Sequence, residues 1–111
     1  MSYNICIHEA AHAVVAQYFN LPVYQVVVEG DSGYCQYGNT KSEFIQAVIA
    51  YAGYYAEVSA GVDVPSFRAI RFMSDRATVD NTDYSYEELE DALDIIFDAH
   101  WNDILAWANR I

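Results

Sequence analysis

Two histidines and a glutamate near the N-terminus form the group of residues whose spacing points most directly to a chemistry. His8, Glu9 and His12 make an H-E-x-x-H pattern. In a helix with 3.6 residues per turn, positions four apart share a face, so both imidazoles can reach one metal ion. Zinc is the metal that this pattern typically binds. The pattern therefore predicts a Zn2+ site with His8 and His12 as ligands.

Glu9 follows the first ligand directly, so it lies near the metal without filling its coordination shell. Zinc lowers the pKa of a bound water to about 7, and a neighbouring carboxylate can take the proton. Glu9 is therefore the candidate catalytic base. Because the pattern supplies two ligands and a base, a third ligand must come from elsewhere in the chain.

Histidine is scarce, with three in 111 residues, and two of the three fall in the pattern. The alternative interpretation is an amphipathic helix with two histidines and no metal. The third, His100, is interpreted as a packed helix residue, because no neighbours have ligand spacing. Cys6 lies two residues before His8, on the wrong side of a helix for shared coordination, and is expected to behave as a small hydrophobe.

Residues 3–19 are expected to form the helix that carries the pattern. Apolar residues and both histidines recur at intervals of three and four, without glycine or proline. The histidines thus share the inward face. Residues 23–29 and 34–37 are rich in β-branched and aromatic side chains and flank a turn at 30–33, which predicts a β-hairpin. An isolated hairpin is marginally stable, so it should pack on the first helix.

Two further helices are predicted. Residues 41–60 form one, with Thr40 or Ser42 as cap and Gly61 at its end. Its internal Gly53 either permits another helix to approach closely or is tolerated slack, since a glycine there costs about 1 kcal/mol relative to alanine. Residues 85–88 (S-Y-E-E) fit a capping box that begins a long helix running to the end of the chain.

The sequence offers three carboxylates as third zinc ligand. Glu57 lies on the second predicted helix, where it either binds the metal or supports a histidine from behind. Asp75 and Asp80 lie in the stretch from 62 to 83, which has the least regular pattern. A histidine six residues after the second one is excluded, because Tyr18 occupies that position.

Composition limits the partners and the compartment. Sixteen acidic and five basic residues give a formal charge of -11, which disfavours nucleic acid and anionic membranes. Two cysteines are too few for a disulfide framework and suggest reduced thiols. No apolar run approaches the roughly 18 residues that cross a bilayer. We therefore expect a cytoplasmic protein, and its oligomeric state stays open.

Three segments together resemble the zinc peptidase domain of the FtsH family of ATP-dependent proteases, and especially its small stand-alone relatives. Residues 8–13 (H-E-A-A-H-A) are similar to the family's H-E-A-G-H-A, with Ala11 in place of glycine. Residues 52–57 (A-G-Y-Y-A-E) are similar to its G-G-R-A-A-E. Residues 74–78 (S-D-R-A-T) resemble its S-N-D-L-x-x-A-T, although one residue instead of three separates the aspartate from the A-T pair.

The resemblance implies that His8, His12 and Asp75 are the zinc ligands and that Glu9 is the base. It also implies an α+β, mostly helical, zincin-like single domain over residues 1–111, with three main helices and a small β-ribbon. At this length we expect neither an ATPase nor a membrane anchor.

The resulting hypothesis is a zinc metalloendopeptidase that hydrolyses unfolded polypeptides or peptides through a zinc-activated water. The alternative is a zinc-binding interaction module of the same fold that has lost turnover. Retention of Glu9 favours the enzyme, because a structural zinc has no use for a base beside its ligand.

Overall fold

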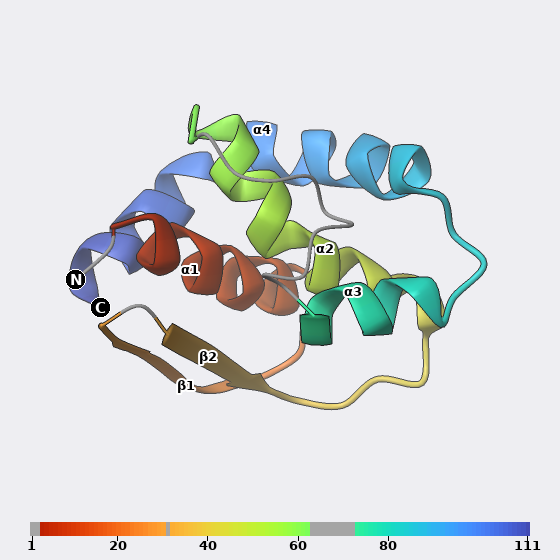
Figure 1. The fold of residues 1–111 in the computed structure, drawn as a ribbon, viewed down its shortest axis with the longest axis horizontal. Helices are drawn as coiled ribbons and strands as arrows, with labels where there is room; N and C mark the ends of the chain where they lie inside the picture. The colour runs from red at the N-terminus through yellow and green to blue at the C-terminus, as the bar shows by residue number, and fades with distance from the viewer. Residues whose placement is uncertain (1–2, 31, 63–72) are drawn as a thin grey trace.

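The computed structural model describes residues 3–30, 32–62 and 73–111. In these ranges the chain forms an α+β, mostly helical domain with four helices and one two-stranded antiparallel sheet, which confirms the predicted class (Figure 1). The elements in chain order are α1 (Tyr3–Tyr18), β1 (Val23–Glu29), β2 (Ser32–Tyr37), α2 (Glu43–Ser59), α3 (Met73–Asp80) and α4 (Tyr86–Arg110).

Helix α1 lies in the middle of the domain, with the sheet on one side and α2 and α4 on the other (Figure 1). Every residue from Ile5 to Ala16 is buried. The helix is therefore covered all round, whereas the sequence pattern predicted a single inward stripe. The alanines of α1 explain the difference, because small side chains let neighbouring elements approach the positions between the apolar residues.

The sheet is the predicted hairpin, although β2 begins two residues earlier than expected. Strands β1 and β2 pair antiparallel, with Val28 opposite Gly33, and an irregularity lies between Val23 and Gln25. Gly30 has a φ of 58° in the connecting turn, a conformation that glycine adopts at little cost. A Cβ at Gly33 would lie 3.1 Å from Cγ of Glu9, so this strand lies directly against α1.

The long helices begin at their predicted caps. The Ser42 hydroxyl accepts a hydrogen bond from the backbone N–H of Ile45 at the start of α2. At the start of α4, Ser85 and Glu88 form the complete capping box. The fourth helix, α3, occupies the end of the stretch from 62 to 83, whose earlier residues 63–72 lie outside the described ranges.

Helix α2 is held on α4 by two tyrosines at the edge of the core. The Tyr51 hydroxyl donates a hydrogen bond to Glu90 over 2.5 Å, and the Tyr55 hydroxyl donates one to Asp94 over 2.6 Å. The Tyr55 ring also stacks on Phe97, with ring centres 5.8 Å apart. These contacts fix the helix that lies behind the histidines of α1.

None of the helices in the described ranges has the length and apolar character needed to cross a membrane.

Candidate metal centre

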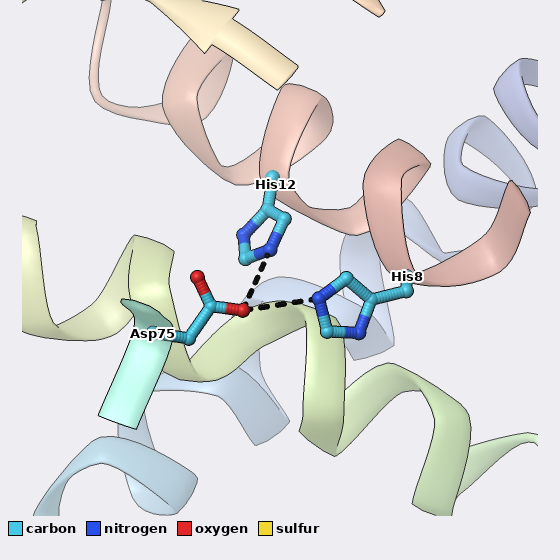
Figure 2. Close-up of side chains that lie close together, drawn as sticks. All are labelled: His8, His12 and Asp75. Atoms are coloured by element: carbon cyan, nitrogen blue, oxygen red, sulfur yellow. Dashed lines mark hydrogen bonds and ion pairs between the residues drawn. The ribbon is translucent and has the colours of Figure 1, made fainter. Parts of the chain in front are cut away.

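Three side chains from two helices converge on the side of α1 that is covered by α2. His8 and His12 extend from α1, and Asp75 extends toward them from the first turn of α3 (Figure 2). One potential ligand atom from each residue lies within 4.8 Å of the other two. The fold thus brings together the two histidines of the H-E-x-x-H pattern and the aspartate that lies 67 residues after the first of them.

His12 is oriented by the backbone of α2. Its Nδ1 lies 2.7 Å from the carbonyl oxygen of Ile49, which can only accept a hydrogen bond. Nδ1 therefore carries a proton, and Nε2 is the ring nitrogen left to face the other side chains. It lies 3.3 Å from Oδ2 of Asp75, so it is directed toward the point where the three side chains meet.

His8 lies between two carboxylates. Its Nδ1 is 2.8 Å from Oε1 of Glu57, and its Nε2 is 3.0 Å from Oδ2 of Asp75. Burial alone would lower the pKa of His8, but the hydrogen bonds to Asp75 and Glu57 outweigh burial and raise it to about 9. Without a metal, both ring nitrogens can donate and the imidazolium form is favoured.

Asp75 is kept ionised by the same contacts. Burial alone would raise its pKa, but the charge and hydrogen bond of His12, followed by those of His8, hold it well below the usual range. Its side chain remains 24% exposed, whereas both histidine side chains are 7% exposed. The Asp75 carboxylate therefore lies on the solvent-facing side of the two histidines.

Gly53 makes room for His8. A Cβ built on this glycine would lie 2.5 Å from Nε2 of His8 and 2.6 Å from its Cδ2, which is closer than real Cβ contacts allow. The sequence left Gly53 either as a point of close helix approach or as tolerated slack, and in the structure it is an imidazole that approaches the glycine. The glycine in the middle of α2 was the only sign of this contact in the sequence.

The donor set fits a zinc ion. Two imidazole nitrogens and a carboxylate oxygen are common zinc donors, and ligand atoms in a tetrahedral site lie roughly 3.3 Å apart. The two Nε2–Oδ2 separations of 3.0 and 3.3 Å are close to this value. Each Nδ1 has its own acceptor, Glu57 or Ile49, which is how metal-bound histidines are usually held.

Glu9 is buried beside the cluster but is not part of it. It is 6% exposed, and no residue in the described ranges forms a hydrogen bond or ion pair with its carboxylate. Burial raises the pKa of Glu9 above its usual range, opposed by the charges of His12 and His8. The proposed base is therefore near the histidines and has a carboxylate that is free to accept a proton.

The other candidates lie elsewhere. Asp80, at the end of α3, has a side chain that is 54% exposed and faces Arg76 and Tyr86. Cys6 is buried in the core, and His100 pairs with Asp103 on α4. Glu57 contacts His8 from behind, the supporting position that the sequence left open for it.

The chain was also compared with known proteins, and neither a protein-family model nor a curated protein sequence matches it.

Proposed function

We propose that this chain is a zinc-dependent peptidase of the FtsH-like type. The observation that carries the proposal is the convergence of His8, His12 and Asp75 beside the buried carboxylate of Glu9. Zinc would be held by Nε2 of both histidines and by Oδ2 of Asp75. When bound, it supplies Lewis acidity, which lowers the pKa of water and polarises a peptide carbonyl.

Glu9 would carry the proton through the reaction. As a carboxylate it accepts a proton from the attacking water while the oxygen forms a bond to the peptide carbon. It then donates the proton to the departing nitrogen, so that the C–N bond breaks and a free amine leaves. A pKa raised by burial supports this role, because a base works best when its pKa is near the working pH.

Strand β2 provides a surface along which an extended peptide would bind. One edge of β2 pairs with β1, and in the described part of the chain the other edge has no strand partner. Gly33 allows this strand to lie against Glu9, because it has no side chain. A Cβ at this position would lie only 3.1 Å from Cγ of Glu9. A peptide that pairs with the free edge gains backbone hydrogen bonds whatever its sequence, which suits unfolded polypeptides as substrates.

The number of ligands favours a catalytic site over the non-catalytic zinc module. Structural zinc is normally held by four protein ligands, whereas catalytic zinc keeps one position for water or substrate. Among the described residues, the group that meets at this point has three members. An unpaired buried glutamate beside a purely structural metal would also carry an energetic cost without a benefit.

The experiment compares Glu9→Gln with the parent after zinc loading. The variant keeps the side-chain shape and removes the base, so we expect unchanged zinc content and a rate of casein or peptide hydrolysis lower by about 10²- to 10⁴-fold. Glu29→Gln, an exposed glutamate of β1, is the matched control and should hydrolyse like the parent. Equal hydrolysis by Glu9→Gln would exclude this mechanism. Stoichiometric zinc without hydrolysis in any variant would favour the non-catalytic module.

A further inference from the structure

A hollow lies between α1 and α4, away from the side of α1 that carries the metal centre and faces α2. It encloses about 370 Å³ and is formed by the C-terminal halves of the two helices. Val14 and Tyr18 line it from α1. At about 100° per residue, Val14 is rotated by about 120° from His8 and about 160° from His12, and Tyr18 by about 80° and about 120°. The volume is at the lower end of the range for small-molecule pockets.

The aromatic wall of this pocket is held by neighbouring groups. The Tyr18 ring meets His100 edge to face, with centroids 5.7 Å apart and planes at 75°. Nδ1 of His100 lies 2.9 Å from Oδ2 of Asp103. His100 is thus held by Tyr18 on one side and by Asp103 on the other. Because the rings of Tyr18 and His100 are already oriented, ligand binding would cost little of their conformational freedom.

The cationic side of the pocket is Arg110. Its guanidinium carbon lies 5.1 Å from the centre of the Trp107 ring, so the two side chains stack. No carboxylate in the described ranges pairs with Arg110, whereas Asp103, the acidic group of the pocket, already faces His100. A stacked guanidinium keeps its in-plane N–H groups available, and their geometry matches a carboxylate.

We propose that this pocket binds a small planar aromatic carboxylate, with the ring against Tyr18 and Trp107 and the carboxylate on Arg110. The rings of Tyr18 and Trp107 favour an aromatic group in the pocket. Arg110, which has no carboxylate partner in the described ranges, favours an anion at this point of a surface that is otherwise strongly acidic, in a chain of net charge -11. The same chemistry occurs in a free aromatic acid and in the C-terminal aromatic residue of a peptide. Neither source requires the metal centre.

The test follows the indole N–H signals in two-dimensional NMR. The chain has two tryptophans, and Trp101→Phe identifies the signal of Trp107. Indole-3-acetate should shift that signal saturably, with a dissociation constant of about 1 mM or tighter. Arg110→Gln and the neutral indole-3-acetamide should each weaken binding by about tenfold or more, because each removes the charge-assisted hydrogen bonds. The tripeptide Gly-Gly-Trp, with its C-terminal amide as control, tests the peptide source.

Arg76→Gln is the matched arginine control, since Arg76 lies on α3 beside Asp80, and it should bind like the parent. Binding of the tripeptide alone, lost in Arg110→Gln, would support the site and identify a chain end as its ligand. The proposal is overturned if neither probe shifts the Trp107 signal up to about 10 mM. It is equally overturned if Arg110→Gln binds both probes as tightly as the parent.

Discussion

Glu57 and His8 face each other across α2 and α1, with Oε1 of the glutamate 2.8 Å from Nδ1 of the histidine. Glu57 is completely buried, and its second oxygen, Oε2, has no hydrogen-bond partner among the described residues. A buried carboxylate with so few partners is expensive to keep. We infer that Glu57 is present to orient His8 and increase its basicity.

Replacing Glu57 by glutamine should weaken zinc binding without abolishing it. The amide oxygen can still accept from Nδ1 of His8, but the negative charge that favours the metal-bound ring is lost. Loss of such a supporting residue typically lowers metal affinity by about 10- to 100-fold. Competition with a chromophoric chelator measures the change. Glu43→Gln, an exposed glutamate at the start of α2, is the control, and an equal loss there would refute a specific role for Glu57.

Replacing Asp75 by alanine should reduce zinc affinity far more than the roughly 10- to 100-fold expected of a supporting residue, because a ligand is removed. Asp80→Ala, on the same helix but exposed, should bind zinc like the parent. The same chelator competition serves for both variants. If Asp75→Ala binds as tightly as the parent and Glu57→Ala does not, then the glutamate is the third ligand.

Gly53→Ala should displace the imidazole of His8. In a helix this change by itself stabilises by about 1 kcal/mol. Here the new Cβ would lie 2.5 Å from Nε2, so the ring or the helix must move. We expect zinc affinity to fall by at least about tenfold, since Nε2 is the ligand atom. Val58→Ala, on the exposed side of α2, should leave affinity unchanged, and an unchanged affinity in Gly53→Ala would show that His8 has room to move.

The metal-free protein should become less stable as the pH rises. His8 has a folded-state pKa of about 9, raised from 6.5, so its stabilising contribution is complete below pH 6.5 and is lost as the pH rises through 9. Zinc competes with this proton, so zinc affinity should rise over the same range. Thermal unfolding with a chelator and zinc titrations between pH 6 and pH 10 measure the two trends. Asp75→Asn should reduce the loss of stability with rising pH. If that loss is as large in the variant as in the parent, other groups cause it.

The sequence by itself determined the elements whose signals are local. The recurrence of apolar residues and both histidines at intervals of three and four, without glycine or proline, specifies α1. Helix contacts join residues at these spacings. Ser42 and the capping box at Ser85 mark the starts of α2 and α4 with hydrogen bonds over three residues. The turn at Gly30 lies between two β-branched and aromatic segments, which is enough to predict the hairpin.

Only the tertiary structure decided which carboxylate meets the histidines. Glu57, Asp75 and Asp80 are all acidic residues downstream of α1, and no spacing rule relates positions 49 or 67 residues apart. Helix packing sends Glu57 to Nδ1 of His8 and Asp75 to Nε2, and leaves Asp80 exposed at the end of α3.

The supports of the site were hidden in the sequence for the same reason. The carbonyl of Ile49 has no side-chain signature, yet it holds Nδ1 of His12 and so leaves Nε2 facing Asp75. Gly53 could be interpreted from the sequence either as a point of close approach or as slack, and only the structure shows the ring of His8 against it. Both contacts depend on how closely α2 approaches α1, which is set by the packing of many small side chains across the interface and by no single motif.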